Sequence, residues 1–353
     1  MTFLAQALLA CVFTALLIIW LRRPAERFGL VDHPGGRKRH LDIIPLTGGL
    51  AMSVGFLAAL SLSFPALGQY KVFFVAIVML AAIGLLDDLG EVSARSKLGV
   101  QVLAAVLMTS WGNHFLTSLG DLFGRGPLDL ANWAIPLTVF ATVAVINGIN
   151  MLDGMDGLAG GLVAVMLGFF ALFAFWLGEV HALKIIAVVI GAVLGFLLFN
   201  APHPWRGRRR TFMGDTGSLV LGFTVTWFTI ELTQRQDVAV PPVVMLWVVG
   251  LVLFDVFTVT VRRLLQRRDP VAPDRAHVHH VLQRCGMSVV QTWVVLLACN
   301  TALGTIGTVA WWVGVPEQFL LVGFILFGCA YFAAFFRPGR LLRLVNQRTR
   351  RGT

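Results

Sequence analysis

Side chains that bind metal ions and phosphates recur at three-residue intervals in one stretch of a largely apolar chain, INGINMLDGMDGLAGG at 146–161. Asn147, Asn150, Asp153 and Asp156 supply amide and carboxylate oxygens, which are the ligands that Mg²⁺ and Mn²⁺ prefer in proteins. In a regular helix Asn147 and Asp156 would lie on opposite faces. All four can converge only where the helix unwinds, which the glycines among them permit. The stretch therefore indicates the rim of a hard-metal site that handles phosphates.

Four further clusters carry compatible chemistry elsewhere in the chain. They are Asp87 and Asp88 followed by Lys97, Asp215 in TFMGDTGSL, the group Arg275, His277, His279 and His280 in DRAHVHH, and the basic patch Arg37, Lys38 and Arg39. Each cluster alone also fits a solvated helix end, because carboxylates cap helix starts and arginines gather at membrane surfaces. Carboxylates, amides and cations together favour Mg²⁺ or Mn²⁺ over zinc, and the sequence has no P-loop motif. These residue types suit phosphoryl transfer, which depends on positioning and on neutralising phosphate charge.

The elements that position these residues are predicted to be membrane helices. The chain has 353 residues, of which 57% are hydrophobic and 13% charged, and its mean hydropathy is +0.81. A soluble domain carries about twice that share of charge. The apolar runs predict an all-α integral membrane protein, a polytopic bundle of about eleven transmembrane helices. The predicted spans are 3–21, 45–64, 71–87, 98–117, 133–149, 158–178, 183–200, 216–233, 240–261, 289–313 and 318–336.

The distribution of positive charge predicts which side of the membrane each connection faces. Alternate connections hold 24 of the 28 lysines and arginines, at 22–44, 87–97, 147–157, 200–215, 262–288 and from 337 onward. The positive-inside rule makes that side cytoplasmic, with the N-terminus periplasmic and the C-terminus cytoplasmic. The net charge of +10 is then explained by topology and anionic lipid, so no nucleic acid is expected as a partner. The polar clusters lie on the same side, which predicts a cytoplasm-facing active site.

Taken together, these motifs resemble the polyprenyl-phosphate N-acetylhexosamine 1-phosphate transferase superfamily, glycosyltransferase family 4. The similarity is greatest to its bacterial undecaprenyl-phosphate N-acetylglucosamine branch. The matching segments are GLVDHPGGRKRH, IPLTGG, the Asp–Asp turn, NGINMLDGMDGL, FMGDTGSL and VAPDRAHVHHVLQRCG. The resemblance implies a transmembrane phosphoglycosyltransferase domain over 1–336 in the bacterial inner membrane, followed by a basic cytoplasmic tail over 337–353.

The resemblance implies a reaction with Mg²⁺, or Mn²⁺, as cofactor. UDP-N-acetylglucosamine would transfer N-acetylglucosamine 1-phosphate to undecaprenyl phosphate and release UMP, which starts lipid-linked polysaccharide such as O-antigen or common antigen. Direct attack of the lipid phosphate is favoured over an aspartyl intermediate, because a phosphate monoester is already ionised near neutral pH. The sequence leaves that choice open.

The resemblance also implies a role for each motif residue. The catalytic residues would be Asp87, Asp88 and Asp215, the metal ligands Asp215 and Asn150, the substrate-binding residues Lys97, Asn147, Asp153, Asp156, Arg275, His277, His279 and His280, and the lipid-phosphate residues Arg37, Lys38 and Arg39. Of the Asp pair, Asp87 is expected to orient or deprotonate the attacking phosphate. Ordinary positive-inside charge explains the basic patch almost as well.

Several alternatives stay open at this point. The His-Val-His-His order favours N-acetylglucosamine over the muramoyl-pentapeptide branch, which has consecutive histidines, but another UDP-N-acetylhexosamine is also compatible. A polytopic transporter would instead use an ionisable residue within a span. The best candidate for that is Asp255, which has no obvious partner in the sequence. A homodimer is left open.

Overall fold

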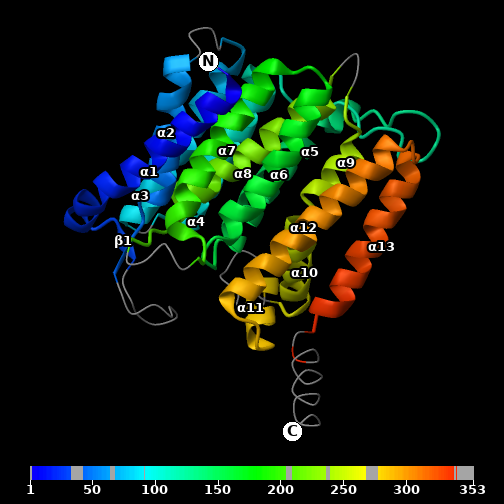
Figure 1. The fold of residues 1–353 in the computed structure, drawn as a ribbon. Helices are drawn as coiled ribbons and strands as arrows, with labels where there is room; N and C mark the ends of the chain where they lie inside the picture. The colour runs from blue at the N-terminus through cyan, green and yellow to red at the C-terminus, as the bar shows by residue number, and fades with distance from the viewer. Residues whose placement is uncertain are drawn as a thin grey trace. The chain divides into compact units, whose positions relative to one another are not determined.

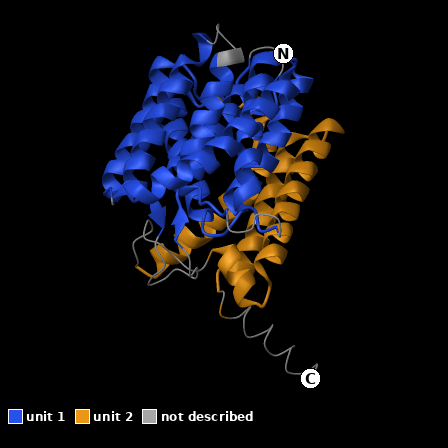
Figure 2. Ribbon diagram, turned by 60° about the vertical axis from the view of Figure 1, so that its left-hand side comes forward, with its two compact units in different colours: residues 1–118, 130–240 blue, residues 119–129, 241–353 orange. Residues whose placement is uncertain are grey.

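In the residues that it describes, the computed structural model of the chain is mostly helical, with one pair of short antiparallel strands, β1 (Val31–Asp32) and β2 (Ile44–Pro45) (Figure 1). It describes residues 2–32, 43–63, 68–90, 92–203, 209–235, 239–267, 277–337 and 339. The chain divides into two compact units (Figure 2). Unit 1 comprises residues 1–118 and 130–240, and unit 2 comprises residues 119–129 and 241–353. Most of the predicted basic tail lies outside the described residues.

Unit 1 holds eight α-helices among its described residues. They are α1 (Phe3–Phe28), α2 (Gly48–Ser63), α3 (Lys71–Leu89), α4 (Ala94–Val106), α5 (Ala134–Leu152), α6 (Leu158–Trp176), α7 (Val180–Asn200) and α8 (Gly214–Thr233). Short 3₁₀ turns precede α3 and α5 (η1, Gly68–Tyr70; η3, Ala131–Trp133), and a π-turn follows α4 (η2, Leu107–Trp111).

Unit 2 holds five described α-helices. They are α9 (Pro242–Val248), α10 (Gly250–Leu265), α11 (Val278–Arg284), α12 (Val289–Trp312) and α13 (Glu317–Phe335). Within this unit the indole Nε1 of Trp247 on α9 donates to the backbone oxygen of Leu320 on α13 at 3.1 Å. The rings of Phe254 on α10 and Phe324 on α13 lie 4.6 Å apart between centroids. Aromatic side chains thus pack α13 against the broken pair α9–α10.

Seven helices in the described part of the chain are long and apolar enough to cross a membrane, judged by length and composition. They are α1, α3, α5, α6, α7, α12 and α13. The pair α9–α10 adds an eighth if its two helices form one span, although they are bent by 76°. Helices also lie in the remaining predicted spans, but α2 is shorter and α4 has only 13 residues. The all-α membrane class is supported, and the count of eleven crossings stays a prediction.

Helix α8 lies in the interior of unit 1, buried along nearly its whole length by α2, α3, α5 and α6. Glycines let its backbone approach those of its neighbours. A Cβ atom on Gly84 of α3 would lie 2.5 Å from the backbone of Thr216. A Cβ on Gly49 of α2 would overlap the backbone nitrogen of Gly217. The start of α8 is therefore fixed by backbone contacts on two sides.

The connections that follow α1, α3, α5 and α7 meet at one end of unit 1. The backbone N–H of Phe212 donates to the carbonyl of Pro45 at 2.9 Å, which joins the segment before α8 to β2. Asn200 at the end of α7 accepts from the backbone of Gly157 at 2.7 Å and donates to the carbonyl of Thr211 at 2.8 Å. These are four of the connections to which the charge distribution assigns one side of the membrane.

The close approach at Gly84 can be tested by adding one methyl group. We expect Gly84→Ala to lower the free energy of unfolding by about 1–3 kcal/mol, because the backbone of Thr216 cannot move aside. Thermal unfolding in detergent, followed by circular dichroism, measures the change. Gly168→Ala on α6 is the matched control, because open space surrounds that position, and it should be neutral or stabilising by up to about 1 kcal/mol. Equal behaviour of the two variants would contradict the packing argument.

Candidate active site

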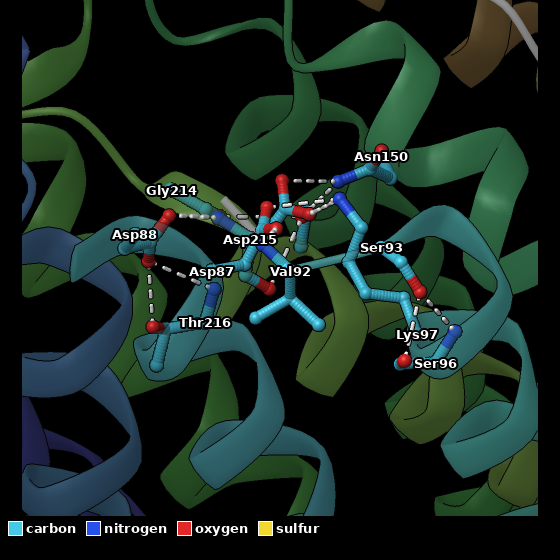
Figure 3. Close-up of polar contacts among 11 residues, drawn as sticks. Asp87, Asp88, Val92, Ser93, Ser96, Lys97, Asn150, Gly214, Asp215 and Thr216 are labelled. Atoms are coloured by element: carbon cyan, nitrogen blue, oxygen red, sulfur yellow. Dashed lines mark hydrogen bonds and ion pairs between the residues drawn. The ribbon is translucent and has the colours of Figure 1, made fainter. Parts of the chain in front are cut away.

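The first turn of α8 is capped by a carboxylate from α3. Asp88 accepts hydrogen bonds from the backbone N–H of Asp215 at 2.8 Å, the backbone N–H of Thr216 at 3.1 Å and the Thr216 hydroxyl at 2.6 Å (Figure 3). The first N–H groups of a helix have no partner within the helix, so a carboxylate there satisfies them and opposes the helix dipole. Gly214 has φ +69°, and a Cβ on it would overlap the Asp88 carboxylate. Asp88 therefore fixes where Asp215 lies.

Lys97 bridges two of the predicted catalytic carboxylates. Its Nζ lies 2.8 Å from Oδ2 of Asp87 and 2.8 Å from Oδ2 of Asp215 (Figure 3). The other oxygen of Asp87 accepts from the backbone N–H of Val92 at 3.0 Å. The chain can return so soon because Ser93 caps the start of α4, only a few residues after α3 ends. The side chains of Asp87, Lys97 and Asp215 are 18%, 25% and 23% exposed, so solutes can reach them.

Asn150 joins this cluster from α5. Its Nδ2 donates to Oδ1 of Asp215 at 2.9 Å and to the Ser218 hydroxyl at 2.8 Å. Side chains from α4 and α5 thus bind Asp215, and α3 holds its backbone. Residues more than 60 positions apart in sequence meet at one carboxylate.

The electrostatics of the cluster favour a bound cation. Burial acts to lower the pKa of the Lys97 ammonium, but its hydrogen bonds and attraction to Asp215 and Asp87 raise the pKa above its ordinary value. In the turn after α5, burial and the charges of Asp215, Asp88 and Asp156 raise the pKa of Asp153 well above its ordinary value. In the described ion pairs of the cluster, the single ammonium of Lys97 faces two carboxylates, Asp87 and Asp215.

The donor atoms fit a hard divalent ion. Carboxylate and amide oxygens suit Mg²⁺ and Mn²⁺, and the Lys97 ammonium already occupies a position between two carboxylates where a cation is stabilised. Among the described residues no three His, Cys, Asp or Glu side chains form a complete metal-binding group. An ion here would therefore need an amide ligand, waters or substrate phosphates, which is how Mg²⁺ is commonly held.

More of the stretch 146–161 is helical than the convergence of its four polar side chains would allow. Helix α5 runs through Leu152, and only the turn at 153–157 is unwound, with φ +72° at Gly157. Asn147 lies inside the helix, where its Nδ2 donates to Gln101 Oε1 on α4 at 2.6 Å. The expectation that all four polar side chains converge is thus corrected, because Asn147 faces α4 rather than Asp215.

Asp156 is also turned to a different partner, one not singled out in the sequence. It forms an ion pair with Arg210, whose guanidinium carbon lies 4.8 Å from the ring centroid of Phe212. In the sequence, positive-inside charge alone accounts for Arg210. Its position two residues before FMGD is the one signal that could have indicated a role beside the site. Asp156 and Arg210 therefore brace the segment that leads into α8.

The predicted histidines belong to unit 2. His277 precedes α11, and its Nδ1 lies 2.7 Å from Oδ2 of Asp255 on α10. Asp255 thus has a partner that the sequence did not reveal. His279 is fully buried, and its ring nitrogens have no hydrogen-bond partner among the described residues. Burial and the neighbouring His280 and His277 lower the pKa of His279 well below its ordinary value. The predicted residues Arg37, Lys38, Arg39 and Arg275 lie outside the described residues.

The chain is similar in sequence to a known family and to named relatives. The sequence model described as glycosyl transferase family 4 matches residues 70–233. The chain is similar to three proteins named undecaprenyl-phosphate alpha-N-acetylglucosaminyl 1-phosphate transferase. That of Escherichia coli (strain K12) is 33% identical over 341 residues, 96% of this chain and 93% of the relative. That of Salmonella typhi is 33% identical over 352 residues, with shares of 99% and 96%. That of Haemophilus influenzae is 34% identical over 336 residues, with shares of 95% and 95%.

The role of Asp88 as a cap predicts a graded effect on stability. We expect Asp88→Ala to lower the free energy of unfolding by about 1–2 kcal/mol, because the first turn of α8 loses its acceptors. Asp88→Asn keeps one acceptor oxygen and should lose less. Glu26→Ala, which removes an exposed ion pair with Arg22, is the control and should change stability by less than about 0.5 kcal/mol. Thermal unfolding by tryptophan fluorescence measures all three, and no loss in Asp88→Ala would refute the cap.

Proposed function

Because the chain belongs to glycosyl transferase family 4, we propose that it transfers N-acetylglucosamine 1-phosphate from UDP-N-acetylglucosamine to undecaprenyl phosphate and releases UMP. Relatives that match the chain over nearly its full length are named undecaprenyl-phosphate alpha-N-acetylglucosaminyl 1-phosphate transferase. The observation that carries the proposal is the joining of Asp87, Lys97, Asn150 and Asp215 in one partly exposed cluster. A cluster of this charge and composition suits the binding of a metal ion and a diphosphate.

The proposed reaction exchanges one phosphoanhydride for another. An oxygen of the lipid phosphate attacks the phosphorus that bears the sugar. The bond from that phosphorus to the UMP oxygen breaks, and UMP leaves as the second product. One anhydride bond forms and one breaks, so no ATP is needed. The protein's part is to align the two phosphates and to compensate the charge that accumulates between them.

Asp215 and Asn150 are proposed to hold Mg²⁺, with Mn²⁺ as a substitute. The side-chain amide of Asn150 lies against the Asp215 carboxylate, so both can face a common ion after the amide turns its oxygen inward. When bound, the ion would neutralise negative charge on the diphosphate. Ser218 supports the arrangement by accepting a hydrogen bond from Asn150.

The remaining members of the cluster are assigned by the contacts they make. We assign Lys97 to the diphosphate, because its ammonium is partly exposed and an ammonium suits the binding of phosphate oxygens. We assign Asp87 to the orientation of the attacking phosphate, acting beside Lys97. Asp88 is proposed as a positioning residue, since its carboxylate is occupied by the start of α8.

The active-site end of unit 1 is proposed to face the cytoplasm of a bacterium, at the inner membrane. The chain is a multi-pass bacterial membrane protein by its apolar helices and its relatives. The excess of lysine and arginine in the connections at this end supports the cytoplasmic assignment. The N-terminus would then be periplasmic and the C-terminus cytoplasmic. A nucleotide sugar from the cytosol and a lipid phosphate from the inner leaflet could both reach the cluster.

Removing the Asp215 charge should abolish transfer. The assay uses purified protein in detergent with undecaprenyl phosphate, Mg²⁺ and a panel of UDP-sugars, and measures UMP. Asp215→Asn should lose about a hundredfold or more in rate, the scale of losing one electrostatic group at a charged transition state. Asp121→Asn, in a loop of unit 2, is the matched control and should keep full activity. The oxygen of the new amide can still accept from the backbone N–H groups of Arg125 and Gly126, so the loop stays intact. UMP release from UDP-N-acetylglucosamine that survives in Asp215→Asn at saturating Mg²⁺ would contradict the assigned role.

Removing the Lys97 charge should separate metal binding from turnover. In Lys97→Met the carboxylates lose a competing cation, so Mn²⁺ should bind at least about tenfold more tightly while transfer falls. Titration of free Mn²⁺ by electron paramagnetic resonance measures the affinity without turnover. Lys71→Met, at the far end of α3, is the control and should leave both quantities unchanged. Equal Mn²⁺ affinity in the two variants would argue against a metal at these carboxylates.

A further inference from the structure

Helix α4 carries Lys97 to the cluster of unit 1, although little of this helix is buried. Of its 13 residues, Gln101, Ala104 and Ala105 are buried. Gln101 is 2% exposed and lies one turn after Lys97, so both side chains leave the same face of the helix. Alanine side chains make few dispersion contacts, so they resist sliding of a helix only weakly. The placement of the Lys97 ammonium therefore depends on what Gln101 contacts.

Gln101 is hydrogen-bonded to Asn147 on α5. Nδ2 of Asn147 donates to Oε1 of Gln101 at 2.6 Å and to the backbone carbonyl of Val143 at 2.8 Å. A carbonyl only accepts, so the nitrogen of the Asn147 amide must face Val143. Its second N–H then requires the oxygen of Gln101, which fixes the orientation of both amides. Losing either partner leaves a buried amide group unpaired, so the pair favours one register of α4 on α5.

The same two helices meet again at Asp215, about one turn away along each helix. On α4, Lys97 lies four residues before Gln101, and its Nζ is 2.8 Å from the Asp215 carboxylate (Figure 3). On α5, Asn150 lies three residues after Asn147, and its Nδ2 is 2.9 Å from the same carboxylate. A shift of α4 against α5 that breaks the amide pair therefore also draws Lys97 away from Asp215.

We propose that Gln101 is a positioning residue, which holds Lys97 at the Asp215 carboxylate by fixing α4 against α5 through Asn147. The inference deepens the proposed function, and it rests on that function for the role of Lys97 at the diphosphate. The described hydrogen bond of Gln101 goes to Asn147, so Gln101 acts on Lys97 through the placement of the helix. Hydrogen bonds between helices of membrane proteins are worth about threefold to twentyfold in an equilibrium constant. That is enough to change how often the ammonium occupies its place.

A simpler reading is that Gln101 is one hydrogen bond among many in the packing of unit 1. That reading predicts lower stability with no particular effect on Lys97. Gln101→Met keeps the length of the side chain and removes the acceptor, whereas Gln101→Glu keeps a carboxyl oxygen that can accept from Asn147. Thr138→Val, which removes the acceptor of the Leu116 backbone N–H near the start of α5, is the matched control for the loss of a buried hydrogen bond.

The test measures the reactivity of the Lys97 amine in the full chain in detergent, without metal or substrate. Limited acetylation with acetic anhydride at one pH, followed by mass spectrometry, compares Lys97 with the exposed Lys71 in the same sample. An amine held between two carboxylates reacts slowly, because both contacts must break first. Labelling of Lys97 relative to Lys71 should rise about threefold or more in Gln101→Met, and less than about twofold in Gln101→Glu and Thr138→Val.

The affinity for Mn²⁺ gives a second readout, whose sign differs between the two readings. If Gln101 acts through Lys97, Gln101→Met relieves the carboxylates of a competing cation, so Mn²⁺ should bind about threefold or more tightly. Gln101→Met combined with Lys97→Met should bind Mn²⁺ no more tightly than Lys97→Met alone, because both changes remove one ammonium. A general disturbance of the site would weaken Mn²⁺ binding instead. Transfer should fall in Gln101→Met and be better kept in Gln101→Glu.

Equal labelling of Lys97 in Gln101→Met and in the unsubstituted protein overturns the inference, as does weaker Mn²⁺ binding in Gln101→Met. If Gln101→Met does not fold, Asn147→Leu, which removes the donor from the other helix, decides by the same criteria. Absence of Mn²⁺ binding or of UMP release in the unsubstituted protein would refute the proposed function, while the labelling of Lys97 would still decide the role of Gln101.

Discussion

The N–H groups at the start of α8 need an acceptor, and the arrangement of the candidate site follows from where that acceptor comes from. Asp88 on α3 supplies it, so the end of one helix and the beginning of another become a single piece of structure. The glycines at 84, 49 and 217 let the backbones of α2, α3 and α8 approach closely enough for this contact. Asp215 is the second residue of α8, so the contacts that fix the start of the helix also fix the position of its side chain.

The cost of placing charge in an apolar medium explains why the cluster lies at helix ends. A carboxylate deep in a bilayer is expensive, whereas one at a helix end can meet a counter-charge, a backbone N–H or water. In unit 1 the carboxylates of Asp87, Asp88 and Asp215 each have such a partner within 3.1 Å. Asp255 shows the other solution in unit 2, because a buried carboxylate there is enclosed by three donors from the start of α11 and from α13.

Much of this arrangement could be predicted from the sequence, but only where the type of a residue and its position along the chain were sufficient to assign its place in the fold. Apolar runs indicate membrane helices, and Asp or Asn beside glycine marks their polar ends. Periodicity could not reveal that Asn147 faces α4, because Asn147 and Asn150 differ by only 60° around the helix. Which side chain each amide contacts depends on the helices packed beside α5. The partners of Asp255 and Asp156 could not be predicted from the sequence, since they are tertiary contacts between residues more than 20 positions apart. The 76° break between α9 and α10 likewise interrupts one continuous apolar run.

Lys97 gives the acidic cluster a counter-charge that is covalently attached to the protein. A tethered ammonium is present at a constant local concentration, whatever the ionic composition of the surroundings, and it lies between two carboxylates that would otherwise repel each other. Folding of this end of the unit therefore need not wait for an ion from solution. The helices that carry these oxygens can therefore stay assembled whether or not an ion is bound there.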